Sequence, residues 1–211
     1  TSSQLVCNVG YVPKSDTDYC PHTVYGKSKV ATEEVVRKLG GGGVEWCLAR
    51  PTTVWGPHMS EHYQSLLQHI KKGTYFHSGS GALYKSYSYA ENIAHQYYQL
   101  LLADKAQVHE QVFYMADYEP LSLRDYANRL ADEMEVKRSP IVPLPVAKLI
   151  ACCGDLLNAC GVRFPYNSFR LKNIRTEYIF DLSKTQAVCG DLPKTFEEGV
   201  CETVRWYLEK R

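Results

Sequence analysis

Short apolar runs that end in glycine or proline alternate with helical patterns along most of this 211-residue chain. The runs at 3–9, 44–53, 111–115 and 178–180 have the lengths and flanking residues of strands. The stretch 75–89 predicts extended, hairpin-like chain that is broken at Gly79 and Gly81. Because strands that alternate with helices are typical of α/β proteins, we expect an α/β fold.

Helices are expected at 23–39, 61–72, 91–102, 122–134, 146–160 and 197–209. Ser122 has the position of an N-cap, three residues before Asp125. In the first helix, the residues expected to face inward are Val30, Val35, Val36 and Leu39. We interpret 146–160 as a core helix, since one of its faces carries Leu149, Ile150, Cys153, Leu157 and Cys160.

Charge and hydropathy exclude several classes of partner. Lys+Arg 24 against Asp+Glu 23 gives a net charge of +1, so no global field would hold nucleic acid or an anionic membrane. No apolar run reaches the roughly 18 residues of a membrane span. The chain begins at Thr1 without a signal region, so its start looks like a cut and secretion is not indicated.

The cysteines and histidines do not have the spacing of a metal site. The 8 cysteines form no C-x-x-C pair, and the 7 histidines show neither H-E-x-x-H nor H-x-H spacing. Most of the cysteines stand among apolar residues, so we expect buried free thiols, no metal and a reducing, cytoplasmic location.

Tyr25 and Lys29 are the sharpest chemical feature of the sequence. Residues four apart at the start of a helix project from one face, and a nearby ammonium favours the phenolate form of tyrosine. Such a pair can transfer protons as a general acid or base. The spacing alone also fits an ordinary contact on a helix surface.

The context of this pair resembles a known family. Residues 1–3 end a strand, Tyr25 and Lys29 open the next helix, and a second strand ends in the run 49–57. This arrangement resembles the extended short-chain dehydrogenase/reductases, the branch that contains the NAD-dependent epimerases and dehydratases of nucleotide sugars. The resemblance continues through 81–92, 181–184, 190–193 and 195–199, so it covers nearly the whole chain.

The resemblance implies the carboxyl-terminal part of a Rossmann-like doubly wound sheet with a smaller α/β substrate-binding lobe. It implies that 1–118 is the partial NAD(P)-binding domain, with an excursion into the substrate lobe at about 74–90, and that 119–211 is mainly the substrate-binding lobe. The resemblance is also compatible with a homodimer.

The same resemblance implies a hydroxyl-Tyr-Lys triad. Ser3 is the preferred hydroxyl, ahead of its neighbours Ser2 and Thr1, and would hydrogen-bond the reacting oxygen while Tyr25 exchanges its proton. Lys29 would hold the nicotinamide ribose. The alternative for Ser3 is a purely structural cap at the strand end.

Further contacts are implied beyond the triad. The residues expected beside the nicotinamide and substrate are Pro51, Thr52, Thr53 and Val54. Many family members have Asn near Thr53, and its absence puts that substrate contact in doubt; the alternative is a turn that needs proline and glycine for geometry alone. Lys85 and either Arg170 or Arg175 are expected to clamp a diphosphate, with solvated surface charges as the alternative.

The glycine-rich dinucleotide turn of the family is missing from this sequence. The run 40–43 follows a helix and precedes a strand, the reverse of the order that cradles a pyrophosphate, so we interpret it as a helix stop. The family's turn would lie upstream of Thr1, and we expect the chain alone to be incomplete and inactive.

Three functions remain open from the sequence. The first is an NAD(P)-dependent epimerase/dehydratase-type oxidoreductase acting on a nucleotide sugar. The second is a hydroxysteroid-dehydrogenase-like enzyme acting on an apolar alcohol, and the third is a non-catalytic structural fragment of the family.

Overall fold

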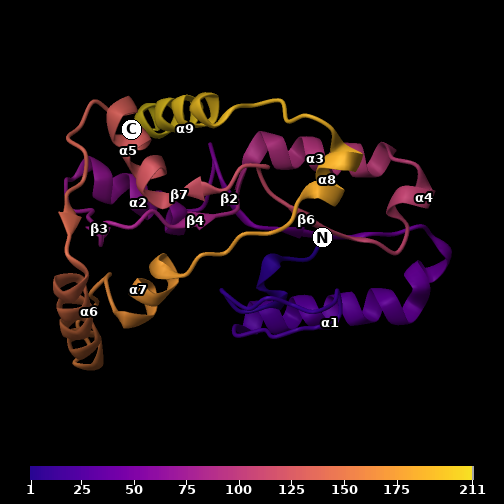
Figure 1. The fold of residues 1–211 in the computed structure, drawn as a ribbon, viewed down its shortest axis with the longest axis horizontal. Helices are drawn as coiled ribbons and strands as arrows, with labels where there is room; N and C mark the ends of the chain where they lie inside the picture. Colours follow the sequence, from indigo (N-terminus) through magenta and orange to yellow (C-terminus); the bar gives the residue numbers. More distant parts are fainter. Residues whose placement is uncertain (211) are drawn as a thin grey trace. The chain divides into compact units, whose positions relative to one another are not determined.

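Parallel pairing is the main feature of the sheets. In the computed structural model, which describes residues 1–210, three of the four strand pairs are parallel (Figure 1). Parallel neighbours cannot be joined by a tight turn and need a long crossover, most often a helix. The expected α/β class is therefore confirmed.

The chain forms two compact units, which we describe separately. The first unit comprises Thr1–Met59, Ser86–Pro120 and the segment from Tyr178 onward. Its elements are the short helical turn η1 (Gln4–Val6), α1 (Val24–Leu39), the glycine turn η2 (Gly40–Gly43), β1 (Leu48–Pro51), β2 (Thr53–Trp55), β5 (Tyr87–Tyr89), α3 (Ala90–Leu102), α4 (Lys105–Val108), β6 (Val112–Met115), α8 (Ser183–Cys189) and α9 (Phe196–Glu209).

Two parallel pairs organise the first unit. Strand β1 pairs with β6, with Leu48 opposite Val112, and β2 pairs with β5, with Thr53 opposite Tyr87. The core around the first pair consists of Ala49, Ile93, Leu100, Val108, Phe113, Met115 and Cys189. Burial of these side chains from β1, β6, α3, α4 and α8 fixes the carboxyl end of β1, where the site described below begins.

The second unit comprises Ser60–Lys85 and Leu121–Glu177. Its elements are α2 (Glu61–Lys71), β3 (His77–Ser78), β4 (Tyr84–Lys85), β7 (Leu121–Ser122), α5 (Leu123–Glu133), β8 (Ile141–Val142), α6 (Leu144–Ala159) and α7 (Ser168–Arg175). Strand β3 pairs with β8 in parallel, and β4 pairs with β7 in antiparallel orientation. Ser122 caps α5 as expected, since its Oγ accepts a hydrogen bond from the Asp125 N–H.

The compact units differ from the expected division at residue 118. The segment from Tyr178 onward groups with the first unit, and Ser60–Lys85 groups with the second. The expected assignment of a cofactor lobe and a substrate lobe concerns function, and it stays a prediction.

Three expectations about extended segments are wrong. Residues 4–6 form a helical turn instead of a strand, because Ser3 accepts a hydrogen bond from the Leu5 N–H. The stretch 75–89 is not a hairpin: β3, β4 and β5 pair with β8, β7 and β2, since the chain turns at Gly79 and Gly81. Residues 178–180 are held by hydrogen bonds with Ser86 and belong to no named strand.

The inward face of α1 also differs from the expectation. Val35 and Leu39 are exposed, whereas Gly26 and Glu33 are the buried residues of this helix. Glu33 forms an ion pair with the buried Arg50, so a polar contact lies on the face of α1 that packs against the first unit. The glycine run acts as the expected helix stop, because Gly40 ends α1 in the left-handed conformation.

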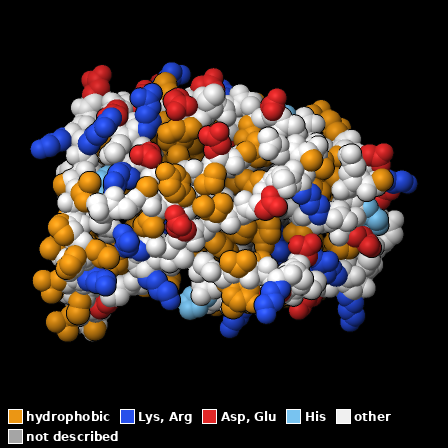
Figure 2. Space-filling model, viewed as in Figure 1, with side chains coloured by type: hydrophobic (Ala, Val, Ile, Leu, Met, Phe, Trp, Pro, Cys, Tyr) orange, Lys and Arg blue, Asp and Glu red, His pale blue; other side chains and the backbone are white. Residues whose placement is uncertain are grey.

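Helix α6 is not the core helix that the sequence predicts. Its buried residues are the small ones, Ala147, Ala151 and Gly154. The larger apolar residues face solvent, with Leu149 66% and Leu156 67% exposed. Figure 2 shows hydrophobic side chains clustered over the position that α6 has in Figure 1. The exposed cysteines of this segment contradict the expectation of mostly buried thiols, although all eight are free: Cys7 and Cys189 alone are buried.

Candidate functional site

The site begins at a serine turn beside β1. The Ser2 N–H donates to the Ala49 carbonyl at 2.7 Å, so the first residues run along β1 before turning into η1. Ser3 is buried, and its Oγ accepts the Leu5 N–H at 3.2 Å. The structural cap considered for Ser3 is therefore present. A hydroxyl that accepts a hydrogen bond can still donate its own hydrogen, so this cap leaves Ser3 able to bind a substrate oxygen.

The start of α1 packs directly on this turn. Thr23 is the N-cap, with its Oγ1 accepting the Gly26 N–H at 2.9 Å. A Cβ at position 26 would overlap the Leu5 carbonyl oxygen, so only glycine lets the helix approach η1 this closely. The close approach brings the serine turn next to the first turn of α1.

Tyr25 and Lys29 share one face of α1, and Lys29 contacts the residue that precedes the two serines. The Lys29 ammonium donates to the Thr1 carbonyl at 3.3 Å and lies 5.6 Å from the centre of the Tyr25 ring. Tyr25 is 51% exposed. The structure therefore brings the three predicted catalytic residues, Ser3, Tyr25 and Lys29, into one region of the first unit.

A buried ion pair holds this region together. Arg50 on β1 donates from Nε and Nη2 to the two carboxylate oxygens of Glu33 on α1, at 2.8 and 2.6 Å, and both residues are fully buried. The same carboxylate accepts the Ser2 hydroxyl at 2.5 Å and the Tyr19 hydroxyl at 2.8 Å. Glu33 thus joins the serine turn, the helix that carries Tyr25 and the strand that leads to Pro51.

Burial and hydrogen bonding shift the pKa values of this pair in opposite directions. Burial raises the pKa of the Glu33 carboxyl, but hydrogen bonds from Arg50, Ser2 and Tyr19 outweigh burial, so its pKa is lowered overall. Burial lowers the pKa of Arg50, and the Glu33 contact more than reverses it. Both groups therefore stay charged, and Arg50 is further enclosed by the Tyr114 hydroxyl at 3.0 Å. Neither Glu33 nor Arg50 is predicted from the sequence: Glu33 is one of several charged residues on α1, and the only signal for Arg50 is a charge within the apolar run 44–53.

The predicted cofactor-binding run lies at the carboxyl end of β1 and in β2. Gln4, next to the serine turn, donates from Nε2 to the Thr53 Oγ1 at 3.4 Å, so Thr53 faces the turn. Thr52 points inward, with its hydroxyl 2.7 Å from that of Ser88. Pro51 and Val54 are half-buried on either side. Of these four residues, Thr53 is the one whose side-chain contacts join it to the triad region.

In the second unit, two guanidinium groups donate hydrogen bonds to the backbone of a glycine turn. Arg175, at the end of α7, donates from Nη1 to the Ser78 carbonyl at 2.9 Å, and Arg124 on α5 donates to the Gly79 carbonyl at 3.0 Å. A hollow of about 380 Å³ adjoins the turn and is lined by Gly79, Ser80, Gly81, Ile141, Pro143, Leu144 and Arg175. The volume lies within the range of ligand pockets.

The other predicted substrate contacts have different surroundings. Lys85 donates to the Asn173 carbonyl near the end of α7 at 2.5 Å, and burial lowers the pKa of its ammonium. Arg170 is five residues before Arg175, which turns its side chain by about 140° around the helix axis, so the two cannot face the same hollow. Nothing in the sequence distinguishes Arg124, which lies inside the capping pattern at Ser122.

The fold and a family match together identify the class of protein. A serine turn packed on a helix with Tyr and Lys four residues apart, beside parallel strands, resembles the arrangement expected from the sequence for the short-chain dehydrogenase/reductases. Residues 13–146 match the family described as "3-beta hydroxysteroid dehydrogenase/isomerase family", and the chain belongs to this family. The resemblance predicted from the sequence is confirmed.

Individual relatives come from both substrate classes considered above. The chain is 27% identical to the N-acetyl-alpha-D-glucosaminyl-diphospho-ditrans,octacis-undecaprenol 4-epimerase of Escherichia coli O157:H7, over 98% of this chain and 63% of the relative. It is 25% identical to 3beta-hydroxysteroid-dehydrogenase/decarboxylase isoform 1 of Arabidopsis thaliana, over 85% of this chain and 44% of the relative. Both relatives are named as enzymes.

The fold is shared with solved epimerase structures. The UDP-glucuronic acid 4-epimerase of Bacillus cereus, solved with NAD, superposes with a TM-score of 0.70 at 14% identity, over 99% of this chain and 60% of that structure. The expected Rossmann-like fold is thereby confirmed. The chain spans about three-fifths of the length of the epimerases that it matches.

Proposed function

We propose that this chain forms the triad-bearing and substrate-binding part of an NAD(P)-dependent oxidoreductase of the epimerase/dehydratase type. The proposal is supported by the packing of α1 on the serine turn and by the Lys29 ammonium, which donates to the Thr1 carbonyl and lies beside the Tyr25 ring. A half-exposed phenol beside an ammonium, on a helix that packs against a serine turn, is a suitable set of groups for moving a proton to or from an alcohol.

The donors at this junction fit a bound dinucleotide. An ammonium has three hydrogens, and the Thr1 carbonyl accepts one from Lys29, which leaves donors for the hydroxyls of a ribose. The backbone of Pro51–Val54 lies at the carboxyl end of a parallel strand, where α/β proteins of this type bind ligands. When bound, NAD or NADP supplies hydride transfer.

The residues of the chain then have distinct tasks. Tyr25, as the phenolate, accepts the proton of the reacting hydroxyl at its Oη and returns it when the hydroxyl is restored. The Ser3 hydroxyl donates a hydrogen bond to the same substrate oxygen and holds it in position. Lys29 stabilises the phenolate through its positive charge and binds the ribose.

A nucleotide sugar is the substrate class that the second unit favours. Within residues 1–210, the ion pairs of the structure include neither Lys85 nor Arg175. Arg175 lines the hollow at the glycine turn, and Arg124 binds the same turn, so two guanidiniums stand where a diphosphate could be held. The similarity to the undecaprenyl-diphosphate-sugar epimerase agrees with this choice.

A hydroxysteroid or similar apolar alcohol is the second candidate. The family match and the similarity to the Arabidopsis hydroxysteroid dehydrogenases favour it. The absence of the Asn that many sugar-nucleotide enzymes have near Thr53 also agrees with it. Net reduction of NAD or NADP by a 3β-hydroxysteroid is followed at the absorbance of the reduced nicotinamide. Conversion of a UDP-sugar to its epimer, which is redox-neutral overall, is followed by chromatography, so the two assays separate the candidates.

Two further proposals concern the cellular location and the oligomeric state of the enzyme. The free thiols support the expected cytoplasmic location, where cysteines stay reduced. The exposed Val35 and Leu39 of α1 support a homodimer, which sedimentation of the chain would test. Within the described residues, no helix is long and apolar enough to cross a membrane.

The proton-transfer assignment is tested by Tyr25→Phe in the enzyme that carries this chain. We expect kcat to fall by about 10²- to 10⁴-fold, the usual contribution of a general acid or base, while KM changes little because the ring remains. The matched control is Tyr98→Phe, an exposed tyrosine on α3. A Tyr25→Phe enzyme that keeps most of its kcat would show that the Tyr25/Lys29 pair is an ordinary surface contact.

A further inference from the structure

We propose that α6 is a membrane-surface helix, which lies in the interface of an anionic lipid layer through its exposed apolar face. The proposal concerns docking on a surface and not crossing of the bilayer. It is independent of the reaction proposed above.

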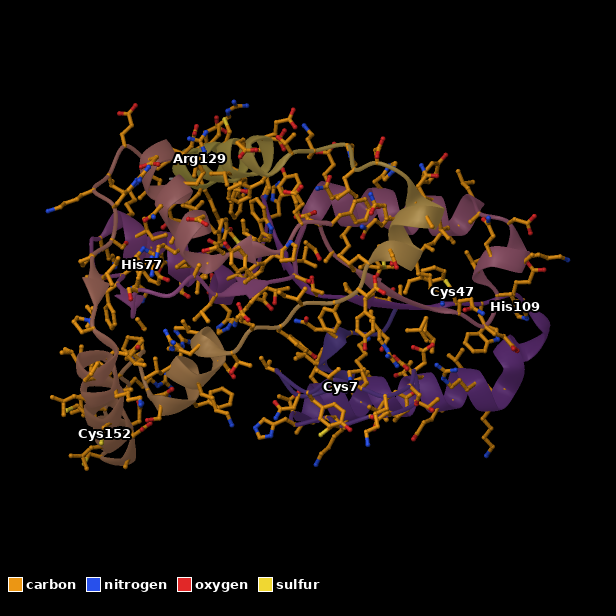
Figure 3. The ribbon with its side chains drawn as sticks, viewed as in Figure 1. Cys7, Cys47, His77, His109, Arg129 and Cys152 are labelled. Carbon is orange, nitrogen blue, oxygen red and sulfur yellow. The ribbon has the colours of Figure 1, made fainter. Side chains whose placement is uncertain are left out.

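The apolar face of α6 is broad and carries no charge. Its exposed residues are Val146, Leu149, Cys152, Cys153, Leu156, Leu157 and Cys160. At 3.6 residues per turn these positions span an arc of about 140°, and the two charged residues of the helix, Lys148 and Asp155, lie beside one edge of this arc. Cys152 is labelled on this helix in Figure 3. A soluble protein seldom leaves such a continuous apolar surface in water.

The packing of α6 explains why these residues stay outside. The helix meets α7 and the preceding loop through Ala147, Ala151 and Gly154, where a Cβ on Gly154 would overlap the Tyr166 carbonyl oxygen. Small residues allow a close backbone approach, and they leave the large side chains on the opposite face. The sequence predicted the reverse, because larger apolar residues are normally the buried ones.

The charge of the segment around α6 favours an anionic lipid surface as the partner of its apolar face. Residues 144–175 contain five basic residues, Lys148, Arg163, Arg170, Lys172 and Arg175, and one acidic residue, Asp155, whereas the rest of the chain carries more acidic than basic residues. A basic segment with an exposed apolar face suits anionic headgroups with acyl chains below them. A second copy of this chain would bring the same basic segment against itself, which disfavours self-association through α6.

The length of α6 fits an interfacial position. Its 16 residues rise about 24 Å, which is shorter than the hydrocarbon core of about 30 Å. The helix can therefore lie along the surface with Leu149 and Leu156 inserted, while Lys148 reaches the headgroups.

Vesicle flotation of the chain tests the proposal. We expect the chain to float with vesicles of phosphatidylcholine and phosphatidylserine, and much less with phosphatidylcholine alone. Leu149→Ser with Leu156→Ser should lower the partition coefficient at least about tenfold, since each leucine loses its burial in lipid. The matched control is Leu101→Ser with Leu102→Ser, two exposed leucines of α3, which should float like the wild type.

The native cysteines supply a second readout. A membrane-impermeant maleimide, followed by mass spectrometry, should label Cys152, Cys153 and Cys160 more slowly when anionic vesicles are present. Cys20, an exposed cysteine of the first unit, should react at an unchanged rate. Lys148→Gln with Lys172→Gln should weaken anionic flotation by roughly fivefold per charge removed.

Three outcomes would overturn the proposal. The first is absence of flotation with anionic vesicles, and the second is equal flotation of the α6 and α3 variants. The third is a concentration-dependent dimer in sedimentation that Leu149→Ser with Leu156→Ser dissociates while vesicles leave the α6 cysteines unprotected, which would assign the face to a second copy.

Discussion

Replacement of Glu33 by glutamine should destabilise the first unit far more than any other single charge change on α1. The Glu33 carboxylate accepts two hydrogen bonds from Arg50 and one each from Ser2 and Tyr19, and it is fully buried. Glutamine keeps the size of the side chain, but it has one acceptor oxygen and turns an NH₂ group toward donors. Arg50 then loses its counter-charge inside the protein.

The magnitude follows from these contacts. Removing one member of a buried ion pair costs about 3–5 kcal/mol, because the other charge is left uncompensated. Counting lost acceptors gives a similar value, since a buried donor without a partner costs about 1–3 kcal/mol and the amide leaves at least one or two of the four donors unpaired. Folded proteins are stable by only about 5–15 kcal/mol, so the loss would be large.

Urea denaturation followed by circular dichroism measures this loss. The matched control is Glu34→Gln, which removes the same charge from the exposed neighbour of Glu33. We expect Glu34→Gln to lie within about 0.5 kcal/mol of the wild type. If Glu33→Gln unfolded at the same urea concentration as Glu34→Gln, the Glu33/Arg50 pair would not hold the three segments together.

The pH dependence gives an independent check on the same pair. The pKa of Glu33 is lower in the folded protein, so its contribution to stability is fully present above the unfolded value of about 4.3 and is lost as pH falls through the folded value. The stability difference between wild type and Glu33→Gln should therefore narrow below about pH 4. A difference that stayed constant to lower pH would contradict the assigned direction.

Three further predictions concern the turn, the nucleotide site and the dinucleotide. Gly26→Ala should lower the free energy of unfolding by about 1–3 kcal/mol in urea denaturation, because the new Cβ would meet the Leu5 carbonyl. Gly81→Ala, which has open space around it, should lower it much less, and equal losses would contradict the tight packing of η1 on α1. Arg175→Ala should weaken UDP binding by about 1.5–3 kcal/mol in calorimetry, and Arg170→Ala should leave it nearly unchanged; the opposite order would assign the phosphate contact to Arg170. Calorimetry of the chain with NAD or NADP should give affinity weaker than micromolar, because its 211 residues contain no glycine-rich turn between a strand and a helix; micromolar binding would show that this turn is dispensable.

Local patterns predicted the parts of this structure that depend on neighbours in sequence. The helix with Tyr25 and Lys29 on one face, and the Ser122 cap of α5, follow from spacings of three or four residues. The contact of Glu33 with Arg50 joins an exposed-looking charge to a strand 17 positions away, and no periodicity indicates it. The same holds for Arg124, which meets Gly79 from a distant helix.

Helix α6 shows a second reason why a prediction from sequence can be wrong. A one-face apolar pattern indicates that a helix has an apolar side, but it does not identify which side packs against the protein. Here the small residues Ala147, Ala151 and Gly154 form the packed side, so the leucines that predicted burial are the exposed ones. The sequence predicted the helix correctly and its environment incorrectly.

The strand pairing has a consequence for the order of folding. None of the four pairs is a hairpin between neighbouring strands within residues 1–210: Leu48 pairs with Val112, and His77 pairs with Ile141. Each pairing must close a long loop before its hydrogen bonds form, and such topologies fold slowly compared with helical bundles. We therefore expect α1 and α9 to gain structure early from local contacts, while the apolar strands β1 and β6 remain unpaired for most of the folding time. During that interval these strands are the segments of the chain most open to aggregation, so dilute, cool refolding should favour recovery of the native protein.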